Sequence, residues 1–272
     1  MKDKKQVVIF IHIPKTGGTT LQRILEKQYK TNNIFKIKAE YFHESIEEFK
    51  NILESKRREI RLLEGHMFFG LHEFVPMPCS YITLLRNPID RIVSHYYYVI
   101  QHPNHYLHQD VVSHKMSLKD YVCSGISTEL DNGQTRLLSG IEDPIDFGQC
   151  SFEILEKAKN NLKYHFAVVG LLERFNESLV LMKKKFNWKI PLYIHANQTR
   201  NRPQSNTFSQ DTLKAITKYN QLDIELYEYA EQLFDELIFK QNQTFYYELT
   251  KLTLSTLLYQ KARKIYAYWV SS

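Results

Sequence analysis

Residues 7–20 read VVIFIHIPKTGGTT, and this stretch decides the fold. Its first seven residues form a continuous apolar run rich in β-branched side chains, which is typical of a strand buried on both faces of a parallel sheet. Pro14 ends the run, residues 15–20 form a glycine-rich turn, and residues 21–26 (LQRILE) have helical spacing. The stretch therefore predicts a strand, a loop and a helix in succession, the beginning of an α/β fold.

A second unit of the same kind follows at residues 81–98. The apolar run 81–85 predicts a strand, and Pro88 suits the first turn of a helix whose apolar positions include Ile89, Ile92, Val93 and Tyr96. Shorter strands are expected at residues 60–63 and 166–170. Repeated strand–helix units predict a central parallel sheet flanked by helices.

The remaining segments predict mainly helices and loops. Residues 101–149 are polar and irregular, which favours short helices and loops that cover a substrate. Two amphipathic helices are expected from residue 209 onward, so the carboxyl-terminal part is helical. We expect one domain at residues 5–240 and an amphipathic helical tail at residues 241–272, which packs on the domain, pairs with another chain or contacts a membrane surface.

Composition limits the class of protein. The 272 residues are 43% hydrophobic and 24% charged, enough for a substantial core, and the net charge of +6 suits anionic ligands without suggesting a nucleic-acid partner. Residues 1–6 (MKDKKQ) and the short apolar run after them fit neither a signal peptide nor a membrane-spanning helix, so a cytoplasmic location is expected. Three scattered cysteines have no metal-ligand spacing and are expected to be reduced.

The glycine-rich turn has the chemistry of a phosphate-binding loop. A turn between a buried strand and a helix directs backbone N–H groups and the positive helix end toward an anion. Lys15 adds a full charge, Gly17 and Gly18 allow close backbone approach, and three threonines offer hydroxyl groups and helix caps: Thr16, Thr19 and Thr20. The alternative is a glycine-rich turn without a ligand.

The order of residues argues against a nucleotide triphosphatase. In GxxxxGK[ST] loops the lysine follows the glycines, whereas Lys15 precedes them, and no acidic pair for magnesium is evident. Arg86 at the end of the second strand and Ser94 on the next helix are expected to reach a second phosphate. Arg86 alone has an alternative reading as a surface salt bridge.

Histidines at three-residue intervals suggest a metal site at first sight. They are His102, His105 and His108, but Pro103 breaks the helix that would align them, and no further ligand cluster is visible. A solvated loop without metal is the favoured interpretation.

Two segments carry a resemblance to a known family. Residues 12–21 (HIPKTGGTTL) resemble the 5'-phosphosulfate loop of carbohydrate sulfotransferases, and residues 84–98 (LLRNPIDRIVSHYYY) are similar to the 3'-phosphate segment of that family. The nearest relatives by this resemblance are heparan sulfate 2-O-sulfotransferases and bacterial-type counterparts. Weaker likeness at residues 131–136 and 220–230 extends it over most of the chain, but not past about residue 240.

The resemblance implies a P-loop-like, three-layer fold and an enzyme. Such an enzyme moves a sulfuryl group from 3'-phosphoadenosine 5'-phosphosulfate (PAPS) to a hydroxyl of a glycan that can be anionic, leaves 3'-phosphoadenosine 5'-phosphate (PAP), and needs no metal. The family pattern assigns Lys15 and residues 16–20 to the 5'-phosphosulfate, and Arg86 and Ser94 to the 3'-phosphate. Lys15 would also stabilise charge on the leaving phosphate oxygen.

His66 is the expected general base. Residues 65–66 (GH) resemble the segment where uronyl 2-O-sulfotransferases place a catalytic histidine, and an imidazole with a near-neutral pKa can accept the proton of an attacking hydroxyl. Three neighbours are rival bases: Glu64, His72 and Glu73.

Two further segments are candidates for ligand contacts. Residues 197–203 (NQTRNRP) resemble a late basic loop of the family, in which Arg200 and Arg202 would close over the cofactor or reach an anionic acceptor. Three residues are expected to shape the acceptor site: Asn132, Gln134 and Arg136. Purely structural roles are the alternative for both segments.

Two other functions stay open from the sequence. One is an ATP- and magnesium-dependent small-molecule kinase that uses the same loop. The other is a polyanion-binding relative that has lost turnover. The oligomeric state is not predicted.

Overall fold

A computed structural model describes residues 6–140, 145–189, 193–194, 203 and 207–271, and in these residues the fold is built on one parallel sheet. The strand order is β2-β3-β1-β4-β5, and all four strand pairings are parallel. The strands are β1 Val7–Ile11, β2 Ile34–Ile37, β3 Leu62–Gly65, β4 Cys79–Leu85 and β5 Phe166–Leu171. The α/β class and the central parallel sheet expected from the sequence are confirmed.

Helices follow every strand. The α-helices are α1 Gly18–Leu25, α2 Phe42–Asn51, α3 Glu54–Arg57, α4 Pro88–Gln101, α5 His108–Ser113, α6 Leu118–Cys123, α7 Gly133–Ser139, α8 Phe152–His165, α9 Phe175–Phe186, α10 Gln210–Tyr219, α11 Gln221–Phe239 and α12 Gln243–Ser271. The short 3-10 helices are η1 Thr31–Asn33, η2 Ala39–Tyr41, η3 Leu71–Phe74, η4 Thr128–Leu130 and η5 Leu172–Arg174.

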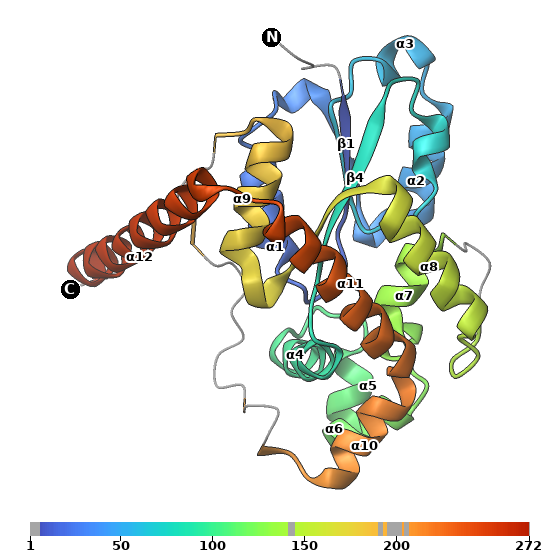
Figure 1. Ribbon diagram of the computed structural model, residues 1–272. Coiled ribbons are helices and arrows are strands. Elements are labelled where there is room, and N and C mark those ends of the chain that lie inside the picture. Colours follow the sequence, from blue (N-terminus) through green and yellow to red (C-terminus); the bar gives the residue numbers. More distant parts are fainter. Residues whose placement is uncertain (1–5, 141–144, 190–192, 195–202, 204–206, 272) are drawn as a thin grey trace.

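The sheet is the middle of three layers. Figure 1 shows α1 and α9 on one side of the strands, and α2 and α8 on the other. Right-handed crossovers require this arrangement, because the chain moves one way along the sheet after β1 and the opposite way after β4. The neighbouring carboxyl ends of β1 and β4 therefore form a topological switch point, the usual place for a ligand in an open α/β sheet.

The predicted elements are present, with shifted ends. β1 stops at Ile11 instead of residue 13, because its pairing with β3 and β4 ends there, at Gly65 and Thr83. The hydroxyl of Thr16 donates to the carbonyl oxygen of Ile13 at 2.9 Å within the loop that follows. β3 lies two residues later than expected. β2 was not predicted, since its four residues are too short for a clear pattern and only Ile37 is buried.

Two separate hydrophobic cores hold the molecule together. The larger surrounds the sheet and includes Ile9, Leu63, Leu84 and Val169. The smaller lies among α4, α5, α6 and α10, which Figure 1 shows beyond the carboxyl ends of the strands. Its members are Ile92, Val93, Val99, Leu107, Val111, Leu118, Tyr121, Val122, Leu130 and Ile216. The short helices expected within residues 101–149 are thus confirmed, and they build a second packing unit beside the sheet.

The carboxyl-terminal part is helical, as expected. α10 and α11 match the two predicted amphipathic helices, and α12 packs on α9 before it projects from the domain (Figure 1). Within the part of the chain that the structure describes, no helix combines the length and apolar character needed to cross a bilayer. The division into residues 5–240 and a tail stays a prediction.

Candidate active site

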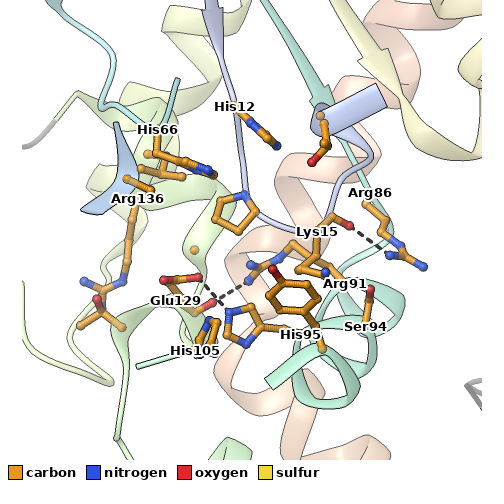
Figure 2. A pocket seen from close by; sticks show the side chains of 18 of the residues that line it. His12, Lys15, His66, Arg86, Arg91, Ser94, His95, His105, Glu129 and Arg136 are labelled. Carbon is orange, nitrogen blue, oxygen red and sulfur yellow. Dashed lines mark hydrogen bonds and ion pairs between the residues drawn. The ribbon is translucent and has the colours of Figure 1, made fainter. Parts of the chain in front are cut away.

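A single cleft collects most of the predicted site residues. It has a volume of about 1640 Å³ and opens where β1, β3 and β4 end. Its lining includes Lys15, His66, Arg86 and Ser94, which come from four separate elements or loops. Figure 2 shows their side chains around one cavity. The fold therefore brings the two expected anion-binding segments and the expected base together.

The loop after β1 has the backbone shape of an anion site. Gly17 is the N-cap of α1 with φ 83°, and among the described residues no side chain caps this helix end. Lys15 also has a positive φ, 69°, which is uncommon for a residue with a side chain. Helix α1 begins at Gly18, three residues earlier than the sequence pattern indicated, so its positive end faces the cleft directly.

Glycine is required at residue 18 for packing. A Cβ atom there would lie 2.0 Å from Cδ2 of His12, so the imidazole of His12 rests against the loop backbone. Residue 17 needs glycine for its conformation, and a Cβ atom would also meet Leu172 at 2.5 Å. The two glycines thus permit a tight loop between the sheet and η5.

The three threonines of the loop differ in position. Thr16 is completely buried, and its hydroxyl bonds to Ile13 within the protein. Thr19 and Thr20 line the cleft. Thr16 therefore stabilises the loop shape, while the other two remain candidates for ligand contact.

Arg86 joins the two anion-binding segments. Its Nη1 donates to the carbonyl oxygen of Lys15 at 3.0 Å (Figure 2). The Nζ of Lys15 lies 3.5 Å from the centroid of the Tyr98 ring on α4, a cation–π contact. The loop after β1, the end of β4 and helix α4 are consequently fixed relative to one another around the cleft.

The side chain of Gln134 forms hydrogen bonds with the backbone of Arg86. Its amide oxygen accepts from the Arg86 N–H at 3.0 Å, and its amide nitrogen donates to the Arg86 carbonyl at 3.0 Å. The side chain is completely buried. The structure therefore gives Gln134 a role in positioning Arg86, where the sequence suggested contact with the acceptor.

Asn132 is likewise part of the scaffold. Its Oδ1 accepts from the N–H groups of Leu222 at 2.9 Å and Asp223 at 3.0 Å, which caps the first turn of α11. Asp223 is completely buried and accepts in return from the N–H groups of Gln134 and Thr135. These reciprocal bonds lock α7 to α11.

Arg136 borders the cleft, but its guanidinium is engaged elsewhere. It forms an ion pair with Asp131 and donates to the carbonyl oxygens of Ile145 at 2.7 Å and Asp146 at 3.0 Å. It is only 9% exposed. Arg136 therefore fixes residues 145–146 beside α7. All three residues expected to shape the acceptor site form hydrogen bonds that support neighbouring parts of the protein.

His66 lies against a second histidine. Its ring is stacked on that of His12, with centroids 4.4 Å apart, and His12 is stacked in turn on Phe10 at 5.5 Å. Burial lowers the pKa of His12 to about 3, with smaller effects from the charges of His66 and Lys15. His12 is thus neutral at physiological pH, and it connects the phosphate loop to His66.

The surroundings of His66 suit a neutral imidazole. Burial lowers its pKa, and the negative charge of Glu129, a backbone hydrogen bond to His12 and the charge of Glu40 oppose that effect. Since the net shift is downward from an ordinary value near 6.5, the imidazole is unprotonated at neutral pH and can accept a proton.

The rival bases lie outside the lining of the cleft. Glu64 is completely buried, and its Oε1 lies 3.4 Å from the amide nitrogen of Gln22 on α1. His72 bonds to the hydroxyl of Tyr81 at 3.0 Å, near the amino end of β4. Glu73 neighbours His72 on η3. His66 is the candidate that faces the cleft, and its role as the base stays a prediction.

Sequence reasoning missed a polar network at the floor of the cleft. Nε2 of His95 lies 3.0 Å from Oε2 of Glu129, and Arg91 donates to the Glu129 carbonyl at 2.8 Å (Figure 2). Burial alone would raise the pKa of Glu129, but the hydrogen bond to His95 and nearby positive charges outweigh it and lower that pKa to about 2. Arg91 and His95 belong to the motif at residues 84–98, whereas no motif in the sequence includes Glu129.

The three histidines at three-residue intervals lie in different surroundings. His102 and His105 border the cleft, and His108 bonds through Nδ1 to the Val99 carbonyl at 2.8 Å. His105 is half-buried, and burial lowers its pKa to about 4, so this residue is less solvated than expected. Among the described residues, no group of three or more potential ligands could hold a metal ion. The predicted basic loop with Arg200 and Arg202 lies outside the described residues.

Comparison with known proteins identifies the family. A family model described as "Sulfotransferase family" matches residues 1–230. The chain belongs to the sulfotransferase family. The membership expected from the two motifs is therefore confirmed over most of the chain, and the match ends before α12.

The chain is similar to named members of this family. It is 25% identical to heparan-sulfate 6-O-sulfotransferase 2 of Gallus gallus, over 84% of this chain and 66% of that protein. It is 27% identical to heparan-sulfate 6-O-sulfotransferase 2 of Homo sapiens, over 84% of this chain and 44% of that protein. The chain therefore spans about half to two thirds of the length of these relatives, whose names specify the 6-O and not the 2-O position.

A weaker match is to a solved structure. The crystal structure of mouse sulfotransferase SULT7A1 complexed with PAP matches 85% of this chain and 91% of its own, with a TM-score of 0.39 and 13% sequence identity.

The expected cytoplasmic location is wrong. The heparan-sulfate sulfotransferases to which this chain is similar are Golgi lumenal enzymes. The expectation depended on residues 1–6 lacking an export signal, and that absence carries no information for a chain that spans only part of its relatives' length.

Proposed function

We propose that the protein transfers a sulfuryl group from PAPS to a hydroxyl of a glycan. One observation carries the proposal: Arg86 donates to the backbone of Lys15, so two cationic segments meet at the switch point of a sulfotransferase-family fold. The donor carries a 5'-phosphosulfate and a 3'-phosphate, and two adjacent anion sites match those two groups.

The loop at residues 15–20 suits the 5'-phosphosulfate. The uncapped end of α1 supplies N–H groups and a partial positive charge, and Lys15 supplies a full charge beside it. Arg86 and Ser94 line the same cleft and suit the 3'-phosphate. Charge on the departing phosphate would be stabilised most by Lys15, since that charge grows in the transition state.

His66 would act at the acceptor end. It takes the proton of the acceptor hydroxyl, the hydroxyl oxygen forms a bond to sulfur, and the bond from sulfur to the 5'-phosphate oxygen breaks. The sulfate ester and PAP leave, and the proton stays on His66 until solvent accepts it. The lowered pKa of His66 supports this role, because the imidazole is ready to accept a proton at neutral pH.

The acceptor class is proposed from the relatives. Both named relatives are heparan-sulfate 6-O-sulfotransferases, so a glucosamine-containing glycan of the heparan type, with its 6-hydroxyl as the attacking group, is the acceptor to assay first. The ionised carboxylate of Glu129 in the cleft supports contact with neutral sugar hydroxyls, because a carboxylate accepts hydrogen bonds from them.

The donor half of the proposal is tested by calorimetric titration of PAP into wild-type protein without added metal. Binding in the micromolar range is expected, and Arg86→Ala should weaken it by about tenfold or more, since a charge-assisted contact is lost. Arg58→Ala is the matched control, because Arg58 is exposed directly after α3 and pairs with Glu54 of that helix. Binding of ATP only in the presence of magnesium, with none of PAP, would overturn the proposal in favour of a kinase.

The acceptor half is tested by following sulfuryl transfer from labelled PAPS to desulfated heparan-type chains. Incorporated label at the glucosamine 6-position is the expected result. PAP binding without transfer to any glycan would contradict the enzymatic assignment and indicate a polyanion-binding relative.

A further inference from the structure

Helix α12 is apolar on two opposite faces, of which the protein covers one. On the covered face, Phe245 is completely buried, and Leu252 and Thr256 are 7% and 4% exposed. Asn176 of α9 donates to the hydroxyl of Thr253 at 3.0 Å, and Glu248 pairs with Lys183 of α9. These contacts fix the first part of α12 to the domain.

The opposite face presents large apolar side chains to solvent. Tyr247 is 67% exposed, Leu254 57% and Leu258 68%. At about 100° per residue, Tyr247 and Leu258 lie within roughly 40° of Leu254 around the helix axis, whereas Phe245 lies about 180° away. Leu257, 51% exposed, widens this strip. Leu254, Leu257 and Leu258 are neighbours on this face, and Tyr247 lies about two turns before them, so large exposed apolar side chains gather on one side of the helix.

The charges around this strip are almost all positive. Residues 243–271 contain one acidic residue, Glu248, and it is the residue paired with α9. Lys251 and Lys261 are exposed. Lys251 lies roughly 60° from Leu254 and flanks the strip, whereas Lys261 lies roughly 20° from Leu254, about two turns further along the helix, at the carboxyl end of the strip. Long lysine side chains can bury their methylene groups in an apolar layer while the amines stay at its polar edge.

We propose that this face of α12, defined by Tyr247, Leu254, Leu257 and Leu258 with Lys251 and Lys261, binds an anionic lipid surface. An apolar strip bordered by lysines is the pattern of a helix that lies in the membrane interface. Symmetric pairing with a second copy fits less well, because it would place the lysine borders of two copies close together without a described acidic partner on that face.

The position of α12 allows this contact. The helix is 29 residues long, about 43 Å at 1.5 Å per residue, and Figure 1 shows it projecting away from the sheet domain. Among the described residues, no helix is long and apolar enough to cross a bilayer, α12 included. The proposed contact therefore has α12 lying along the membrane surface. The cleft is bordered by other elements, and lipid contact along α12 leaves it open to ligands.

The proposal is tested by sedimentation of the full chain with vesicles. Wild-type protein should bind vesicles that contain about 30% phosphatidylserine and bind pure phosphatidylcholine at least about tenfold more weakly. The double change Leu254→Ser and Leu258→Ser should weaken binding by roughly thirtyfold, from the apolar area withdrawn. Lys251→Gln with Lys261→Gln should weaken it by roughly thirtyfold and reduce its salt dependence.

Leu53→Ser is the matched control, because Leu53 is 69% exposed and far from α12 in the sequence; this change should leave vesicle binding unaltered. PAP titration shows whether each variant is folded. Two results would overturn the proposal. One is wild-type protein that does not bind anionic vesicles. The other is a dimer in analytical ultracentrifugation that the paired serine variant converts to monomer, since a second copy would then cover the strip.

Discussion

Replacing Lys15 with alanine separates a catalytic role of this residue from a structural one. In the structure its Nζ contacts the Tyr98 ring at 3.5 Å, and an accessible cation–π contact contributes about 0.5–1 kcal/mol to stability. The positive φ of residue 15 costs alanine as much as lysine, so the backbone adds no difference. Loss of the contact with Tyr98 should therefore lower the melting temperature by about 2–4 °C.

The effect on turnover should be much larger. Removing one group that stabilises developing charge costs about 3–4 kcal/mol in the transition state, which corresponds to a hundredfold to thousandfold decrease in kcat. Lys27→Ala is the matched control, because Lys27 is an exposed lysine just after α1. The assays are differential scanning fluorimetry and sulfuryl transfer from PAPS at saturating donor. A fivefold or smaller decrease in kcat by a folded variant would refute the assignment of Lys15, as would unfolding that accounts for the whole loss.

Three further changes test the surroundings of the site. Gln134→Leu removes both hydrogen bonds between the completely buried Gln134 side chain and the Arg86 backbone, at a cost of about 1–3 kcal/mol each, so PAP affinity and thermal stability should both fall, as measured by calorimetry and fluorimetry. His66→Ala should reduce kcat by about 10²–10⁴ with PAP affinity unchanged; a matching loss of PAP affinity would argue against a base. Glu129→Gln removes a charge that raises the pKa of His66, so the acidic limb of the kcat/KM profile should move to lower pH. No movement of that limb in a folded, active Glu129→Gln variant would mean that His66 is not the titrating base.

The strand–loop–helix units were predictable because their signals are local. A β-branched run and a Gly-Gly turn at residues 17–18 report on the backbone conformation of neighbouring residues only, and the structure has a strand and a turn there. Strand ends were less accurate, since β1 stops at Ile11 although the apolar run continues to Ile13, and periodicity does not reveal the contact between Thr16 and Ile13 in the loop that follows.

The site was predictable in part for the same reason. Lys15 and Arg86 lie in the loops after β1 and β4, Ser94 lies on the helix that follows β4, and the carboxyl ends of these two strands are adjacent, so their convergence follows from topology. The orientation of Gln134 and the ionisation of Glu129 depend on residues 34 to 48 positions away. Residue type alone does not show whether such a polar side chain faces a ligand or supports another residue.

The two hydrophobic cores have a consequence for protein engineering. The donor loops extend from strands of the larger core, whereas α4 and residues 102–129, which also supply side chains to the cleft, carry most members of the smaller core. Helix α4 is the connection, since it carries Ser94 toward the cleft and Ile92, Val93 and Val99 into the smaller core. Chimeras that exchange residues 102–130 between homologues, with α4 retained, should therefore change which glycan is modified while the sulfate donor stays the same.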